Sequence, residues 1–259
     1  MYENISVTRD GHITTITLNR PQVMNAISPD MHWELQRAFD DFATDADQWV
    51  GIVTGMGERA FCAGSDLKNI AAGGKVTLPP SGYAGLIGRF DLDKPLIAAV
   101  NGVAVGGGFE IALCCDLIVA SDKAKFGLPE PKVGLAAVGG GLLNLPRQIP
   151  LKQAMGMILT GRQVSAQEGL ALGFVNEVTA PEDLMTAARR WADEILACSP
   201  MSIRASKQTV MRSLAELSVE VSLAAQSDYP AMLAMRGSDD SKEGPRAFAE
   251  KRTPQWKGR

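Results

Sequence analysis

The stretch Gly102–Ser121, GVAVGGGFEIALCCDLIVAS, decides the class of fold. It predicts a strand, a glycine turn, the first turns of a buried helix and a second short strand rich in branched residues. One residue does not suit a core, because Glu110 is the only charged residue between Pro95 and Cys115. Burying an unpaired carboxylate is costly and usually raises its pKa, which is what a general acid or base near neutral pH requires. Glu110 is therefore either a catalytic candidate or a structural carboxyl with its hydrogen bonds satisfied.

The chain before this stretch alternates between strands and helix-sized segments. The run Asn4–Leu18 alternates polar and apolar residues around Asp10 and Gly11, which predicts a two-stranded hairpin. Ser28 and Pro29 are the residue types of an N-cap and a first helical position, so a helix is expected after them. Short apolar strands are predicted at Trp49–Gly55, Leu96–Val100 and Leu117–Ser121. Strands separated in this way indicate βαβ units and a parallel sheet, hence an α/β fold.

The second half of the chain is mainly helical in pattern. Ser165 and Glu168 form a capping box before a short helix that stops at Gly173. Another helix is expected from Pro181, and helical signals continue from Pro200 to Met235 without a strand. The apolar stripe of the helix after Pro181 consists of Leu184, Ala187, Ala188, Trp191 and Ile195.

Two segments are expected at the surface. Residues 71–81, AAGGKVTLPPS, combine glycine and proline without periodicity, which predicts a loop suited to a lid or specificity role. The basic tail, residues 243–259, contains Phe248 and Trp256. Two aromatic residues in a charged tail indicate that it docks against another surface.

Composition narrows the function classes. With 259 residues, 46% of them hydrophobic, the chain can bury a large core. A net charge of -3 gives no basic face for nucleic acid or an anionic membrane. The N-terminus lacks the pattern of a secretory signal, so a cytoplasmic location is expected. Asn101 and Gly106–Gly108 interrupt the longest apolar run, which argues against a membrane span.

The cysteines and histidines do not suggest a metal site. The four cysteines form no CxxC pair, and two of them are adjacent in an apolar run, which is typical of reduced thiols in a core. They are Cys62, Cys114, Cys115 and Cys198. The only histidines, His12 and His32, are interpreted as ordinary structural residues. No metal is therefore expected, and a Ser-His-Asp mechanism is disfavoured because both histidines are interpreted as structural.

Two glycine-rich motifs could present backbone amides to a ligand. The first contains Gly55, Gly57 and Gly64 after a strand, and it has neither a dinucleotide nor a P-loop fingerprint. The second, Gly106–Gly108, precedes a helix whose N-terminal amides would suit an oxygen that gains negative charge. Turn formation or close packing would account for both motifs equally well. Glu130, between two prolines, is by composition a solvated loop residue, and the sequence alone does not place it near Glu110.

Five ordered blocks of this sequence together resemble the enoyl-CoA hydratase/isomerase, or crotonase, family. They run from the first glycine motif to the tail. The blocks are RAFCAGSDL (59–67), KPLIAAVNGVAVGGGFEIALCCDLIVAS (94–121), FGLPEPKVGL (126–135), LTGRQVSAQEGLALGFVNEV (159–178) and EGPRAFAEKR (243–252). The resemblance implies an α/β spiral of repeated ββα units over residues 1–197, holding the CoA and catalytic sites. It also implies a helical region over residues 198–259 that completes the CoA site and drives assembly into a homotrimer or homohexamer.

The resemblance also implies roles for single residues. Glu110 and Glu130 would be the two catalytic glutamates, and the amides of Ser65 and Gly107 the oxyanion hole. The expected substrate is an acyl-CoA thioester, with no other cofactor, no metal, no nucleic acid and no membrane partner. The residues expected to bind CoA are Val23, Asn25, Ala26, Ala63, Asp66, Leu67, Phe248 and Lys251.

Two glutamates imply reversible addition of water to the 2,3-double bond of an enoyl-CoA. Glu110 would act mainly on the water that attacks C3, and Glu130 on the proton at C2. Ala137 and Val138 depart from the family's usual motif beside the acyl pocket, which leaves the acyl group open. The alternatives are a carnitinyl-CoA dehydratase (crotonobetainyl-CoA hydratase), an aryl-propenoyl-CoA or terpenoid enoyl-CoA hydratase, and a non-catalytic relative that binds acyl-CoA or RNA.

Overall fold

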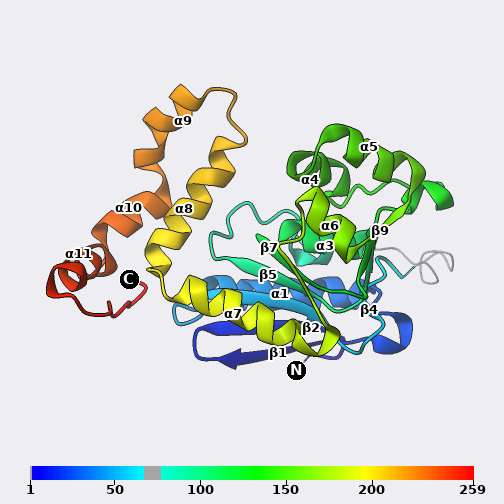
Figure 1. The fold of residues 1–259 in the computed structure, drawn as a ribbon, viewed down its shortest axis with the longest axis horizontal. Helices are drawn as coiled ribbons and strands as arrows, with labels where there is room; N and C mark the ends of the chain where they lie inside the picture. Colours follow the sequence, from blue (N-terminus) through cyan, green and yellow to red (C-terminus); the bar gives the residue numbers. More distant parts are fainter. Residues whose placement is uncertain (1, 67–76) are drawn as a thin grey trace.

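The strands form two sheets in a computed structural model that describes residues 2–66 and 77–259 (Figure 1). The main sheet has the order β1 (Ile5–Asp10), β2 (Ile13–Leu18), β3 (Val50–Gly55), β5 (Leu96–Val100), β7 (Leu117–Ser121) and β10 (Glu177–Thr179). The small sheet has the order β4 (Ala60–Cys62), β6 (Val103–Val105), β8 (Lys125–Gly127) and β9 (Gln163–Ser165). The short strands of the small sheet, three residues each, were not predicted from the sequence.

The two sheets arise from one repeated unit. The pairs β3 and β4, β5 and β6, and β7 and β8 each place their first strand in the main sheet and their second in the small sheet. In the main sheet, strands β2, β3, β5, β7 and β10 pair in parallel, and β1 pairs antiparallel with β2 as its hairpin partner; in the small sheet, β9 pairs antiparallel with β8. Gly11 turns that hairpin with a φ of +56°. The predicted α/β class, parallel sheet and hairpin are confirmed.

Helices follow the strands as the sequence predicts. They are α1 (Pro29–Thr44), α3 (Gly107–Cys114), α4 (Gly141–Gln148), α5 (Leu151–Thr160), α6 (Ala166–Leu172), α7 (Leu184–Leu196), α8 (Pro200–Ser213), α9 (Val219–Ala225), α10 (Pro230–Gly237) and α11 (Asp240–Glu250). The Ser28 hydroxyl caps α1 by accepting from the Met31 amide. The Ser165 hydroxyl caps α6 in the same way.

Two local predictions need correction. The Glu168 carboxylate does not complete the capping box at Ser165, because it pairs with Arg162 at 2.6 Å. Pro181 begins a short 3-10 turn, η4 (Pro181–Asp183), and α7 starts only after it. Of the loop predicted over 71–81, residues 71–76 lie outside the described residues, and residues 77–81 carry neither helix nor strand.

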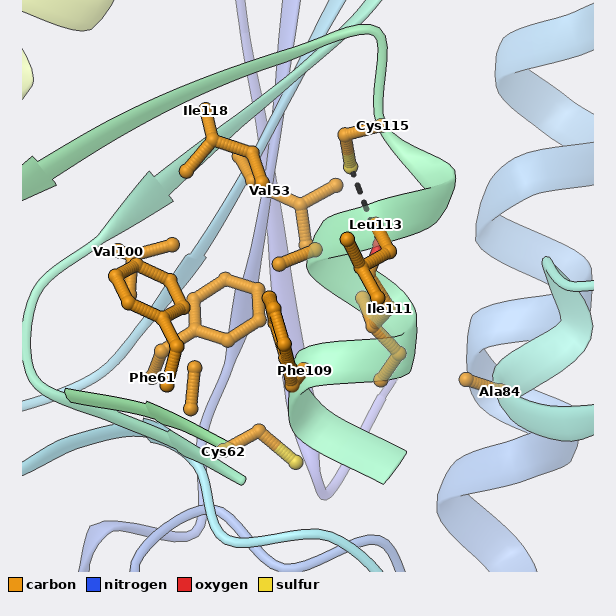
Figure 2. Packing of buried hydrophobic residues seen from close by; sticks show 14 of the residues in the cluster. Val53, Phe61, Cys62, Ala84, Val100, Phe109, Ile111, Leu113, Cys115 and Ile118 are labelled. Atoms are coloured by element: carbon orange, nitrogen blue, oxygen red, sulfur yellow. Dashed lines mark hydrogen bonds between the residues drawn. The ribbon is translucent and has the colours of Figure 1, made fainter. Parts of the chain in front are cut away.

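The main core lies between α3 and the strands (Figure 2). Phe109 from α3 packs against Phe126 and Phe174 with ring centroids 5.4 Å and 5.2 Å apart. In Figure 2, Phe109 points toward Phe61, while Ile111 and Leu113 project from the next turns of the helix. Because this helix is buried nearly all round, its first turn has a fixed position relative to both sheets.

The histidines have structural surroundings. His12 stacks on Trp49 with ring centroids 3.7 Å apart, and its Nδ1 lies 2.6 Å from the Asp47 carbonyl oxygen. His32 is buried, and its Nδ1 accepts a hydrogen bond from the Ala84 amide at 2.9 Å. Burial lowers the pKa of His32 to about 4, so this ring is neutral at physiological pH.

The C-terminal helices stand apart from the two sheets. Helix α7 covers the main sheet, and Leu184, Ala187 and Ala188 are buried there. Figure 1 shows α8 to α11 extending away from this layer. The tail docks on its own chain through Trp256, whose Nε1 donates to the Ala197 carbonyl at 2.9 Å, whereas Phe248 is 87% exposed. The division at residues 197 and 198 stays a prediction. No helix of the described ranges is long and apolar enough to cross a membrane.

Candidate active site

The two glycine motifs meet at the start of α3. Gly64 has a φ of +88°, and a Cβ built on it would lie 3.1 Å from the Gly107 nitrogen and 3.0 Å from the Val105 carbonyl oxygen. Only glycine allows this approach of two main chains. The approach places Ser65, the residue after Gly64, close in space to Gly107, and neither of their amides has a hydrogen-bond acceptor among residues 2–66 and 77–259. These two amides are the ones predicted to form the oxyanion hole.

Glu110 lies in the first turn of α3 and is 3% exposed. The Gly141 amide donates a 2.9 Å hydrogen bond to its Oε1. A Cβ on Gly139 would lie 2.5 Å from the Glu110 Oε2, so the loop before α4 fits closely around the carboxyl. The glycines at positions 139 and 141 therefore fix where this carboxyl points.

The environment of Glu110 favours its neutral form. The pKa of this carboxyl is raised from 4.5 to about 7, chiefly by burial and also by the nearby Glu130, against the hydrogen bonds from Gly141 and Gly139. A carboxyl with a pKa about 7 exchanges protons readily near neutral pH. Glu110 is thus a titrating group rather than a permanently ionised structural one.

Glu130 opens the 3-10 turn η3 (Glu130–Val133) and reaches back to the same place. Its Oε1 would lie 3.1 Å from a Cβ on Gly106, the residue before α3. Its Oε2 is buried and has no hydrogen-bond partner in the described part of the chain. Burial raises the pKa of this carboxyl as well. Glu130 is thus a half-buried turn residue and not a fully solvated one, and its carboxyl lies beside the start of α3, while its catalytic role stays a prediction.

Tyr83 is a residue of this site that the sequence analysis missed. It belongs to the 3-10 turn η2 (Tyr83–Gly85), and the Ser65 hydroxyl donates to its Oη at 3.2 Å. A Cβ on Gly107 would collide with the same hydroxyl. The only signal in the sequence is an isolated tyrosine shortly after a loop of glycines and prolines, which is too common a pattern to indicate a site.

Most residues predicted to bind CoA cluster beside this centre. The Ala63 amide donates to the Met24 carbonyl at 3.0 Å, which joins the segment containing Val23 and Ala26 to the end of β4. Arg20 ties the cluster together, because its guanidinium reaches the Ala26 carbonyl at 2.6 Å and Asp66 at 3.2 Å. These contacts bring Val23, Ala26, Ala63 and Asp66 to one edge of the site.

Asn25 has a structural task within that cluster. Its side chain is fully buried, accepts from the Arg20 amide at 2.9 Å and donates to the Ala60 carbonyl at 2.8 Å. Its φ of +55° lies in the left-handed region, which asparagine tolerates better than most residues. Asn25 therefore shapes the turn that presents its neighbours.

Of the three other predicted CoA residues, one lies outside the described residues and two lie in the C-terminal helical region. Leu67 lies outside the described residues. Phe248 and Lys251 belong to α11 and its C-cap, at the opposite end of the chain from β4 and β9 (Figure 1). Within one chain, these two side chains do not reach the glycine motifs, so a contribution from them would have to come from another copy.

Comparisons with known proteins identify the family of this chain. A family model described as enoyl-CoA hydratase/isomerase matches residues 8–259. The carnitinyl-CoA dehydratase of Salmonella typhi is 44% identical over 266 residues, covering 100% of both chains.

Solved structures extend the likeness to the fold. Enoyl-CoA hydratases from Mycobacterium tuberculosis H37Rv and Mycobacterium marinum are 40% and 42% identical, with a TM-score of 0.92 and 99% of each chain covered in both cases. The expected crotonase fold is thereby confirmed. By its match to the family model and its identity to these relatives, this chain belongs to the enoyl-CoA hydratase/isomerase family of enzymes.

Proposed function

We propose that this enzyme adds water reversibly across the 2,3-double bond of an enoyl-CoA thioester. The observation that carries the proposal is the convergence of two carboxyls with raised pKa values on the glycine turn at the start of α3. Glu110 approaches from the helix, and Glu130 approaches from the turn after β8. Two such carboxyls, one ionised and one protonated, are what hydration and its reversal require.

The amides of Ser65 and Gly107 would hold the thioester oxygen. Attack at C3 moves charge onto that oxygen, and donors already in place stabilise the resulting enolate without reorganisation. The partial positive charge at the N-terminus of α3 acts in the same direction. A backbone amide remains after most side-chain substitutions, so this part of the site is built into the fold.

The two glutamates would divide the work on the water. Glu110 takes a proton from the water as its oxygen bonds to C3, and Glu130 delivers a proton to C2 as the enolate collapses. The addition thereby places a hydroxyl on C3 and a hydrogen on C2, and the reverse sequence eliminates water. Because like charges close together disfavour double ionisation, the pair shares protons, and its titration belongs to both residues.

The main alternative concerns the acyl group. Identity of 44% to a carnitinyl-CoA dehydratase supports a trimethylammonium substrate, and the same water chemistry would serve it. Such a cation favours an acidic or aromatic partner. Val138, next to the Gly139 that fits around Glu110, is apolar and 84% exposed, so this position offers no charge partner. We therefore place simple enoyl-CoA hydration first, with carnitinyl-CoA second.

A panel of CoA thioesters tests these alternatives. Loss of the conjugated enoyl-thioester absorbance would be followed with crotonyl-, long-chain, aryl-propenoyl- and crotonobetainyl-CoA. The highest kcat/KM is expected with an uncharged enoyl group, whereas a preference for crotonobetainyl-CoA would favour the carnitinyl-CoA activity. No turnover with any of them, together with retention on an RNA column, would favour the non-catalytic class instead.

The C-terminal helices support assembly into a trimer or hexamer. Their exposed apolar residues would favour association if the chain were a monomer in water. Those exposed by more than half are Val210, Met211, Leu214, Leu217, Val219, Val221, Leu223, Leu233 and Phe248. We propose that another copy covers part of this surface and that α11 of one copy completes the CoA site of the next. Light scattering should give a mass of three or six chains, and a monomer at micromolar concentration would contradict this.

A further inference from the structure

The Tyr83 hydroxyl contacts both residues of the proposed oxyanion hole. The Ser65 hydroxyl donates to Tyr83 Oη at 3.2 Å, and the same Oη lies against the Cα of Gly107, where a Cβ would overlap with it. The two amides meant for the thioester oxygen belong to these two residues. A polar side chain at this place therefore borders the point where charge would develop.

The turn that carries Tyr83 is held firmly by α1. The Ala84 amide donates to His32 Nδ1 at 2.9 Å, with Ala84 itself in the left-handed region at a φ of +54°. The Gln36 side chain accepts from the Ser81 amide at 3.1 Å. The His32 ring meets the Tyr83 ring edge to face, with centroids 4.7 Å apart. These contacts position the tyrosine before any substrate binds.

The phenol also keeps a proton to donate. With the Ser65 hydroxyl as donor in their hydrogen bond, the Tyr83 hydroxyl can rotate its own hydrogen toward another acceptor. Burial, chiefly, raises the pKa of Tyr83 well above 10.0, and the charges of Glu110 and Glu130 act in the same direction. The hydroxyl is thus neutral over the whole pH range in which the two glutamates titrate.

We propose that Tyr83 donates a third hydrogen bond to the thioester oxygen, beside the amides of Ser65 and Gly107. The proposal rests on the hydratase function given above and adds a side-chain donor to an oxyanion hole built from main chain. A donor aimed at developing charge strengthens its bond in the transition state, so it acts on kcat more than on binding. Ser65 would then contribute twice, through its amide and by orienting the phenol.

Tyr83→Phe removes the hydroxyl and keeps the ring. Loss of one oxyanion donor typically lowers turnover ~100-fold or more. Because two backbone amides would remain in Tyr83→Phe, we expect kcat to fall ~10-fold to ~100-fold and KM to stay nearly unchanged. Tyr2→Phe is the matched control, because the Tyr2 hydroxyl donates to the Asp41 carboxylate at the surface, at 3.4 Å. Equal kcat for Tyr83→Phe and the wild type would overturn the proposal.

A spectroscopic readout separates this role from a structural one. An aryl-propenoyl-CoA bound to the enzyme should absorb at longer wavelength than in water, because hydrogen bonds at the carbonyl oxygen polarise the conjugated system. Tyr83→Phe should retain binding and lose part of that shift. A full shift in the variant would show that the hydroxyl does not reach the thioester oxygen, whatever happens to kcat.

Ser65→Ala provides a second, independent test. It keeps the amide and removes the hydroxyl that orients the phenol, so a loss of a few-fold in kcat and a smaller red shift are expected. In a Tyr83→Phe background the same change should cost nothing further, and additive losses would contradict the coupling. If Tyr83→Phe does not fold, the red shift of Ser65→Ala decides. Failure of the wild type on every enoyl-CoA would instead remove the hydratase function, and this proposal with it.

Discussion

The start of α3 and the C-terminal helices show opposite combinations of polarity and burial. At the start of α3, polar groups are buried inside one chain, and Glu110 accepts a hydrogen bond there from the Gly141 amide. In α8 to α11, apolar side chains are exposed, such as Leu217 and Phe248, and their partners are absent from one chain. Under the proposed function, one subunit would hold all the groups that carry out the chemistry, whereas part of the substrate affinity would come from another copy. The following experiments sharpen or break that contrast.

The largest effect is expected from the two carboxyls. Glu110→Gln and Glu130→Gln should each lower kcat by about 10²- to 10⁴-fold, because each removes one partner in proton transfer. Acyl-CoA affinity should stay near the wild-type value, which isothermal titration with a saturated acyl-CoA would measure. Near-normal turnover in either variant would show that the chemistry lies elsewhere.

The fit of the loop around Glu110 comes next. Gly139→Ala places a Cβ 2.5 Å from the Glu110 Oε2, so the carboxyl or the loop must move. A displacement of about 1 Å in a catalytic group can cost about 10²-fold in rate, and we expect a loss of that order in kcat. Gly156→Ala is the control, since a Cβ there meets nothing within 4 Å. If both variants keep full activity, Gly139 does not position Glu110.

Stability should depend on pH through Glu110. Its pKa is raised from 4.5 to about 7, so the stabilisation from the neutral carboxyl is complete below 4.5 and is lost as the pH rises through about 7. Glu110→Gln cannot ionise. Relative to the wild type, its free energy of unfolding should therefore rise over this interval, by about 3 kcal/mol in total.

Urea unfolding at pH 4, 6 and 8 would measure this difference. The exposed Glu182, changed to Gln, serves as the control and should show no such trend. A constant difference between Glu110→Gln and the wild type across the pH range would mean that Glu110 ionises freely in the folded enzyme.

Substitutions in the C-terminal region should change the affinity for acyl-CoA instead of the catalytic rate. Phe248→Ala and Lys251→Ala should raise KM for acyl-CoA a few-fold with little change in kcat, because they would contact CoA from a neighbouring subunit, away from the reacting bond. The double variant Glu110→Gln, Phe248→Ala should show both losses independently. A loss of kcat at Phe248 comparable to that at Glu110 would remove the division between the two regions.

The smallest effect should come from chelation. Glu110, Glu130 and the amide donors supply the proton transfers and the charge stabilisation that the proposed reaction needs. Dialysis against EDTA should therefore leave kcat within experimental error, measured with the best enoyl-CoA of the panel. A loss restored by a divalent cation would require a further component in the site.

Much of this molecule could be predicted from local patterns. The hairpin at Gly11, the Ser28 cap and the strand at Leu96–Val100 follow from turn, capping and periodicity rules, and each is present. The three-residue strands of the small sheet are too short for any periodicity, so they were missed.

The site was predictable only in part for a similar reason. Glu110 stood out because a lone charge in an apolar run is a local anomaly. Glu130 stood in a segment of ordinary loop composition, and its burial depends on contacts with a turn more than twenty residues away, so only the family resemblance indicated it. Tyr83 is positioned by α1 through His32 and Gln36, and no local pattern encodes such long-range support.

The close approach of Gly64 to Gly107 has a consequence for how such an enzyme can change. Since the proposed oxygen site consists of peptide nitrogens, exchanging side chains around it leaves its two main donors in place. The acyl pocket can then accumulate substitutions, at Ala137 or Val138, while the capacity to stabilise an enolate persists. Because these catalytic donors belong to the backbone, the scaffold tolerates new substrates. Related sequences can therefore differ in the substrate that they accept.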